Sequence, residues 1–259
     1  MLCYLCWSLW HLGYVEQAAK VAGQAVRHAD QVSHPHTQVY TICHARGLLD
    51  IFRRRADETS SYAGRVISLC EEHGFPQWAA GGRILQGWAA ISQGAAERGI
   101  ELLRDGVGAW RNTGARLWLP IFLALEAEAH AQLGDGDTAL QVTAEALQIA
   151  EETGERWALA EVLRVRAGLL LAAGHPGEEV EATLLQSLQI SRHQQARSWE
   201  LRTAYDLARL WQQQGRGAEA LRLLQAIYQK FTEGFDSPDL KRAESLEVEL
   251  EASASGRSL

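Results

Sequence analysis

The first residues in this 259-residue chain whose types and spacing suggest chemistry are two cysteines near the N-terminus. Cys3 and Cys6 have the C-x-x-C spacing of zinc and thiol sites, and histidines that could add ligands stand at positions 11, 28, 34, 36 and 44. A zinc site of this kind needs a second matched pair, and the two other cysteines, Cys43 and Cys70, do not supply one. We therefore predict that Cys6 serves packing and that the chain has no metal site.

A second motif, Gly134-Asp135-Gly136-Asp137-Thr138-Ala139, matches the G-x-G-x-x-G/A fingerprint of dinucleotide sites. The fingerprint requires a strand before it, within a βαβ unit. A helical pattern precedes Gly134 instead, which predicts an ordinary turn. The G-x-x-x-x-G-K-[ST], H-E-x-x-H and G-x-S-x-G motifs do not occur. The sequence thus predicts a protein that is not an enzyme and has no catalytic, cofactor-binding or metal-binding residues.

The elements that position these residues recur with a period of about forty residues. One series of glycines stands at positions 94, 134, 174 and 215, and a second at 74, 114, 154 and 234, with a gap near 194. Glycine takes the left-handed conformation that ends a helix, so two series predict two helices per period. A tryptophan follows the second series at 78, 118, 157 and 199. Such self-similarity indicates a solenoid, in which each unit buries its apolar face only against its neighbours.

Small residues mark the places where paired helices are expected to cross. In each repeat, one small residue stands about two helical turns before the position where the first helix ends. Another small residue often stands about one and a half turns after that position. This pattern resembles the tetratricopeptide repeat (TPR), in which bulk is excluded where the two helices approach most closely. The residues before the stop are Cys6, Gly47, Gly87, Ala127, Ala167 and Ala208, and those after it are Ala18, Gly99, Ala139 and Ala220.

We therefore predict an all-α fold, a right-handed TPR-like α-solenoid of about six helix-turn-helix repeats, as a single superhelical domain over residues 1–251. The helical pairs are expected at 1–13 with 15–32, 37–53 with 57–73, 77–93 with 95–112, 116–133 with 137–153, 156–173 with 177–193, and 197–214 with 217–231. A last helix, N-capped by Ser237 and starting at Pro238, should cap the solenoid to about Glu251. Residues 252–259 are predicted to form a flexible tail.

Several segments also resemble the TPR-like C-terminal region of large bacterial signalling ATPases of the STAND-like type, which often carry an adenylate/guanylate cyclase domain. The segments are Gly-Phe-Pro-Gln-Trp at 74–78, Gly-Ala-Arg-Leu-Trp at 114–118, Gly-Glu-Arg-Trp at 154–157, and the runs 194–202, 208–215 and 231–236. The resemblance implies a regulatory or scaffolding segment. It does not imply catalysis, because the cyclase and ATPase portions are absent from this sequence.

Composition narrows the choice of partner and compartment. The net charge of −7 and the pI of about 5.7 argue against nucleic acid and against anionic membrane, both of which need a basic surface. Hydrophobic residues make up 47% of the chain, which excludes disorder. The four cysteines lie in the first third and favour a reducing cytoplasm. The apolar first ten residues lack a basic leader and are too short to span a bilayer. We predict a cytoplasmic protein without a cofactor, whose partner is a protein or peptide.

The first helix of each pair lines the inner surface of a TPR solenoid, and the same arrangement here would give a concave face with several arginines toward its C-terminal end. Such a face would suit an acidic peptide or a carboxylate, and the alternative is an ordinary polar surface. The sequence thus predicts a protein-interaction, scaffolding or regulatory module. A small-molecule sensor with its ligand in the concavity is the alternative. The candidate side chains are His44, Trp88, Glu128, Arg164, Arg202, Tyr205 and Arg209.

The N-terminal end is predicted to be an interface. The tryptophans at 78, 118, 157 and 199 follow the repeat and are expected to pack between repeats, whereas Trp7, Trp10 and Trp88 break the period and are candidates for exposed contacts. Together with Leu2 and Leu5, Trp7 and Trp10 place apolar residues on every side of the first helix. A large exposed apolar patch usually marks an interface. We therefore predict that residues 1–14 dock on a preceding domain or pair with a second copy in a homodimer.

Overall fold

The computed structural model describes residues 1–255, and every regular element in that range is a helix. Since α3, η1 and α4 run on as one rod, the described residues form thirteen helical rods, which are six antiparallel pairs and a final helix. The predicted all-α TPR-like solenoid is confirmed. The helices are α1 (Leu2–His11), α2 (Val15–Val32), α3 (Pro35–Thr41), the π-helix η1 (Ile42–Leu48), α4 (Leu49–Phe52), α5 (Ala56–His73), α6 (Pro76–Ser92), α7 (Ala96–Asn112), α8 (Leu119–Gln132), α9 (Gly136–Thr153), α10 (Leu159–Ala172), α11 (Gly177–His193), α12 (Arg197–Gln213), α13 (Gly217–Tyr228) and α14 (Pro238–Ser255).

Left-handed backbone separates the helices at the predicted positions. Gly134 (φ +81°) lies in the turn between α8 and α9, and Gly154 (φ +70°) is the C-cap of α9. Where the glycine series is interrupted, Arg54 (φ +57°) and Gln195 (φ +55°) adopt the same conformation without glycine. The segment at Gly134 is therefore a helix-to-helix turn, in which the side chain of Asp135 caps α9 by accepting from the backbone N–H of Thr138 (3.2 Å).

Two helices begin later than predicted, and one ends later. α8 and α10 start at Leu119 and Leu159, because a hydrogen-bonded turn from Arg116 to Leu119, and an equivalent one from Arg156 to Leu159, comes first. Trp118 lies in the first turn with φ +68°. α14 continues to Ser255, so the beginning of the predicted tail is helical, and residues 256–259 lie outside the described residues.

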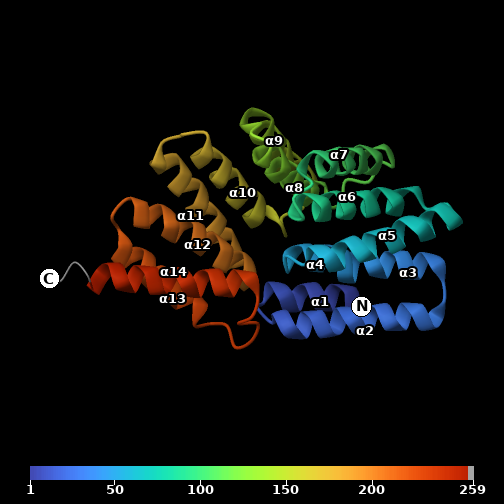
Figure 1. Cartoon of the computed structure of the whole chain (residues 1–259), viewed down its shortest axis with the longest axis horizontal. Coiled ribbons are helices and arrows are strands. Elements are labelled where there is room, and N and C mark those ends of the chain that lie inside the picture. Colours follow the sequence, from blue (N-terminus) through green and yellow to red (C-terminus); the bar gives the residue numbers. More distant parts are fainter. Residues whose placement is uncertain (256–259) are drawn as a thin grey trace.

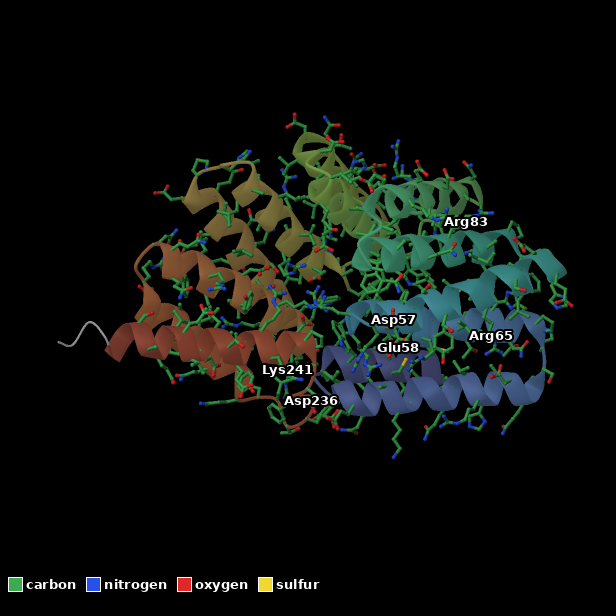
Figure 2. The ribbon with its side chains drawn as sticks, viewed as in Figure 1. Asp57, Glu58, Arg65, Arg83, Asp236 and Lys241 are labelled. Atoms are coloured by element: carbon green, nitrogen blue, oxygen red, sulfur yellow. The ribbon has the colours of Figure 1, made fainter. Side chains whose placement is uncertain are left out.

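The solenoid completes one turn and closes on itself. The first helices of successive pairs contact one another in order, α1 with α4, then α6, α8, α10 and α12, and α12 contacts α1 again. Figure 1 shows this as a ring in which the blue N-terminal helices meet the red C-terminal ones. Beside this junction Asp236 and Lys241 form an ion pair of 3.1 Å at the surface (Figure 2). The two ends of the solenoid therefore cover each other.

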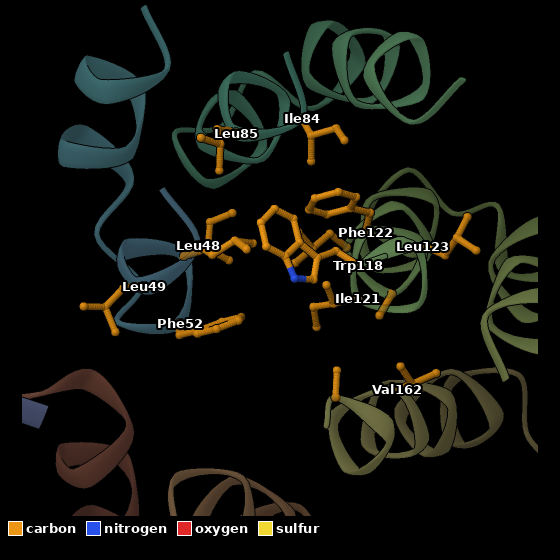
Figure 3. Close-up of a cluster of buried hydrophobic side chains, with 14 of the residues drawn as sticks. Leu48, Leu49, Phe52, Ile84, Leu85, Trp118, Ile121, Phe122, Leu123 and Val162 are labelled. Carbon is orange, nitrogen blue, oxygen red and sulfur yellow. The ribbon is translucent and has the colours of Figure 1, made fainter. Parts of the chain in front are cut away.

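Aromatic and aliphatic side chains fill the middle of the ring. In Figure 3, Trp118 lies between Leu48 of η1, Leu85 of α6 and Phe122 of α8. Trp10 and Trp199 join the first pair to the sixth, with ring centroids 4.6 Å apart. The main hydrophobic cluster is thus shared by distant repeats, whereas a simple solenoid buries apolar surface only between neighbours.

The predicted small-residue positions lie at the helix crossings. A Cβ added to Gly87 would stand 2.7 Å from the carbonyl oxygen of Gly99, so α6 and α7 cross with their backbones nearly in contact. In the next pair the equivalent residues, Ala127 and Ala139, have no exposed surface. The repeat spacing in the sequence therefore predicted the helix register correctly.

Replacing Ala127 by leucine should overpack the crossing of α8 and α9 and lower the free energy of unfolding by about 1–3 kcal/mol. Ala144→Leu on the exposed side of α9 is the matched control and should change it by less than about 0.5 kcal/mol. Urea denaturation of both variants measures the difference. Equal midpoints for Ala127→Leu and Ala144→Leu would contradict the packing at this crossing.

Within residues 1–255, no helix is long and apolar enough to cross a lipid bilayer.

Candidate binding groove

A cavity of about 590 Å³ opens between the C-terminal halves of α6, α8 and α10 and the segment that follows α4. Three of the predicted concave residues, Trp88, Glu128 and Arg164, line it together. Val165 and Leu169 contribute apolar surface to the same wall. Its size lies in the range of ligand-binding pockets in proteins. We call this cavity, with all its lining residues, the groove.

The other predicted concave residues lie elsewhere. His44 is buried, and its ring stacks on Tyr40 with centroids 3.9 Å apart. Arg202 and Tyr205 line a small adjoining crevice that Arg164 also reaches. Arg209 forms a largely exposed ion pair with Glu249 (2.7 Å). The predicted set therefore divides into three groove residues, two neighbours and two residues with separate surroundings.

Arg164 is held by carboxylates on three helices. Its guanidinium donates to Glu161 through Nε (2.8 Å) and Nη2 (3.0 Å), to Asp206 of α12 (2.8 Å) and to Glu128 of α8 (3.2 Å). Burial alone would lower the pKa of Arg164, but Glu161 and Asp206 outweigh it and raise the pKa well above its ordinary value. Arg164 is therefore fully ionised, and four of its five N–H groups donate to carboxylates.

Arg202 extends this network to the junction of the two chain ends. Its side chain donates to Glu161 (2.9 Å), to Asp239 of α14 (2.7 Å) and to the carbonyl of Phe52 at the end of α4. Arg54 donates to the other oxygen of Asp239 (2.8 Å). Two arginines thus share one carboxylate where α4, α12 and α14 meet. We call Arg54, Glu161, Arg202 and Asp239 the latch.

The predicted recognition of an acidic ligand by an arginine-rich wall loses support from this geometry. Arg164 and Arg202 already donate to carboxylates of the chain itself, so they act as internal cross-links. The remaining hydrogen-bonding capacity in the groove is mixed. Among the described residues, the two terminal nitrogens of Arg54 have no partner and remain available as donors. The carboxylate of Glu128 accepts only from Arg164 among these residues and can accept further bonds. The groove therefore offers both donors and acceptors, as a peptide backbone requires.

The predicted N-terminal interface is wrong for its two largest side chains. Trp7 and Trp10 are only 8% and 2% exposed, because α12 and the segment before α10 cover them. Trp7 packs on Trp157 and donates through Nε1 to the carbonyl of His44 (2.6 Å). Leu2 is half-buried and Leu5 is 44% exposed. Neither tryptophan can therefore contribute to the predicted docking or homodimer interface.

The N-terminal cysteines serve as packing residues in this structure. Cys6 has no exposed surface, and its thiol donates to the carbonyl of Cys3 (3.0 Å). Burial raises the pKa of Cys6 to about 12, which keeps the thiol protonated. Within residues 1–255, no group of three or more His, Cys, Asp or Glu side chains is placed to hold a metal ion.

Sequence reasoning missed three charged residues of the latch. Arg54, Glu161 and Asp239 were not predicted as site residues. One signal was available for Arg54, which occupies a place where other repeats have glycine. A non-glycine residue with positive φ often marks a functional or strained position. No sequence signal paired Arg54 with Asp239.

The described residues form a TPR-like solenoid in which side chains of three successive repeats line the groove. No protein-family model matches the chain. The uncharacterized protein R02095 of Rhizobium meliloti (strain 1021) is 24% identical over 206 residues, which are 80% of this chain but 20% of that protein. The chain thus corresponds to about a fifth of this relative's length.

Three solved structures share the fold. A Rap protein complexed with Competence and Sporulation Factor has a TM-score of 0.69 and 12% identity, and the match covers 99% of this chain and 71% of that one. NprR in complex with its cognate peptide NprX has a TM-score of 0.65 and 15% identity over 96% and 70% of the two chains. The third is the STAND protein PH0952 from Pyrococcus horikoshii, with a tetratricopeptide repeat sensor, at a TM-score of 0.51 and 13% identity over 100% and 37%. These likenesses establish the TPR-like fold.

Proposed function

We propose that this chain is a regulatory module that binds a peptide or an extended segment of a protein in the groove. The observation that supports this most is the cavity itself, in which Trp88, Glu128 and Arg164 from three successive repeats line one opening. NprR, which shares the fold, is solved with a cognate peptide. An extended peptide offers alternating N–H and C=O groups, and the donors of Arg54 and the acceptor of Glu128 match both kinds.

We propose further that the module belongs to a larger signalling ATPase. The chain matches a fifth of protein R02095, and a STAND protein shares the fold in its repeat sensor. The link to nucleotide cyclases rests on the sequence motifs alone. In such a protein, ligand binding in the groove would change how the repeats contact the other domains. A small-molecule effector in the same groove is the alternative, and its volume of about 590 Å³ would accept one.

Selection of the purified chain against a displayed library of random peptides tests the proposal. Gly168 lines the groove from α10, and a Cβ built there meets nothing within 4 Å, so Gly168→Phe should fill the groove without strain. We expect this variant to lose at least tenfold in affinity for the selected peptides. Gly64 on α5 is equally open and exposed but lies outside the groove, so Gly64→Phe is the matched control and should bind as the parent does.

Fluorescence anisotropy with a labelled selected peptide gives both dissociation constants. Equal binding by the two phenylalanine variants would place the peptide outside the groove. Failure of the selection, together with a metabolite retained through purification and seen by native mass spectrometry, would favour the small-molecule alternative.

A further inference from the structure

A second cavity, of about 580 Å³, lies where α1 meets the segments that precede α10 and α12. It is separate from the groove and shares no lining residue with it. None of its lining side chains carries a charge at neutral pH, since burial lowers the pKa of its single histidine, His11, to about 4. The lining residues are Tyr4, Trp7, Ser8, His11, Leu12, Trp157, Gln194 and Ala196. We call this cavity the aromatic pocket.

Most nitrogen donors in the aromatic pocket are already used by the protein. The indole N–H of Trp157 donates to Glu155 (2.7 Å), and that of Trp7 donates to the carbonyl of His44 (2.6 Å). His11 Nδ1 lies 2.8 Å from the carbonyl of Trp7, and because a carbonyl only accepts, Nδ1 carries the proton. What remains for a ligand is mainly aromatic surface and acceptor atoms. Such a pocket disfavours anions, which need donors.

The aromatic rings form a corner. Trp7 and Trp157 are nearly parallel, with centroids 5.5 Å apart and planes at 29°, whereas Tyr4 stands almost perpendicular to Trp7 at 74° and 6.2 Å. Tyr4 is 55% exposed, so the corner opens to solvent. A positive charge is attracted to the faces of such rings, most strongly to tryptophan.

Glu155 adds a negative charge beside this corner. Its carboxylate accepts from Trp157 and from the backbone N–H of Trp118, yet within residues 1–255 it forms no ion pair. Burial raises the pKa of Glu155, as expected for a partly desolvated carboxylate without a cationic partner. The positive charge of Arg202, which approaches Trp10 and Trp199, is balanced by Glu161 and Asp239.

The chain contains a filled version of the same arrangement. Trp211 donates its indole N–H to Glu181, also at 2.7 Å, and the guanidinium of Arg216 lies 4.5 Å from the Trp211 ring while pairing with Glu181 at 2.8 Å. Indole, carboxylate and cation thus complete one another there. The pair of Trp157 and Glu155 repeats the first two parts, and the described residues place no cation over Trp157.

We propose that the aromatic pocket is a binding site for a small organic cation, with a guanidinium or alkylammonium group on an apolar body. The cation would lie against Tyr4 and Trp157, attracted by the charge of Glu155, as Arg216 lies on Trp211. The ligand would contact α1 on one side and the segments before α10 and α12 on the other. Its binding therefore stabilises the closed ring.

Calorimetric titration with benzylguanidine and benzylurea tests this proposal, because the two probes share shape and apolar body but only the first is charged at pH 7. We expect benzylguanidine to bind at least tenfold more tightly than benzylurea. This factor corresponds to the lower end of the energies of desolvated cation–aromatic contacts. Benzylguanidine at saturation should also raise the melting temperature. Equal affinities for the two probes would mean that the pocket does not recognise the charge, which would overturn the proposal. Absence of benzylguanidine binding at about 10 mM, roughly the weakest affinity that the titration detects, would overturn it as well.

Two variants locate the site. Glu155→Gln keeps a hydrogen-bond acceptor for Trp157 but removes the charge, and Trp157→Leu keeps apolar volume but removes the aromatic face. We expect each to weaken benzylguanidine at least tenfold, with folding checked by circular dichroism. Trp211→Leu is the matched control and should leave the affinity within about twofold of the parent. A loss in Trp211→Leu equal to that in Trp157→Leu would refute the assignment, and so would unchanged binding by Glu155→Gln.

Discussion

Replacing Arg202 by methionine is expected to lower the free energy of unfolding by about 3–5 kcal/mol, the range for breaking a buried ion pair. The Arg202 side chain is 7% exposed and donates to two carboxylates and one carbonyl. Its removal leaves Glu161 and Asp239, whose side chains are only 7% and 17% exposed, with one partner fewer each. Because these bonds join α12 to α4 and α14, the loss should appear as opening of the ring at this junction.

Arg209→Met on the same helix is the matched control. Its pair with Glu249 is nearly half-exposed on both sides, so the change should cost about 0–1 kcal/mol. Urea denaturation gives both free energies, and hydrogen exchange at α1 and α14 reports the opening. If Arg202→Met costs no more than Arg209→Met, the latch does not hold the ring in solution.

The same network gives the stability a dependence on acid pH. Burial alone would raise the pKa of Asp239, but the guanidinium groups of Arg202 and Arg54 outweigh burial and hold this pKa well below its ordinary value. The pKa of Glu161 is also lowered, because Arg164 and Arg202 outweigh burial. An acid with a lowered folded-state pKa contributes its stability fully above its ordinary pKa, about 4, and loses it as the pH falls below that value. Arg202→Met should therefore flatten the decline in stability below pH 4.

Replacing Trp199 by alanine is expected to cost about 3–5 kcal/mol, the range for a buried aromatic side chain. Trp199 has no exposed surface, and its ring packs on Trp10 (4.6 Å) and Phe52 (5.2 Å), so it fills the space between the sixth pair and the first two. The backbone closed around this side chain cannot refill the space without moving whole helices. Thermal and urea denaturation measure the effect.

Trp211→Ala provides the comparison, because Trp211 lies on the same helix but is half-buried and contacts Arg216 at the surface. It should cost distinctly less than Trp199→Ala. Trp199→Phe, which keeps most of the aromatic volume, should recover a large part of the loss. Similar losses for Trp199→Ala and Trp211→Ala would mean that the ring centre is not tightly packed.

The helical repeat could be predicted from the sequence because it depends on local rules. The glycines at 94, 134 and 174 end helices wherever they stand, and small residues such as Gly87 and Ala127 are required at each crossing. Each of these constraints acts within one repeat or between neighbours. The sequence alone therefore determined the all-α class, the pairing of helices and the C-terminal capping helix from Pro238.

The closure of the ring was decided by the tertiary structure. A small rotation between neighbouring repeats, added over six pairs, brings Trp10 beside Trp199 and Arg54 beside Asp239, although 189 and 185 residues separate them in sequence. No repeat by itself encodes that sum. The side chains that cover Trp7 and Trp10 lie far from them in the sequence. The two tryptophans were therefore predicted to be exposed, although the structure buries them. In the groove, Trp88, Glu128 and Arg164 were predictable as inner residues. The tertiary structure decided that Glu128 of α8 and Asp206 of α12 neutralise Arg164, because the helical period does not fix which side chains of neighbouring repeats meet.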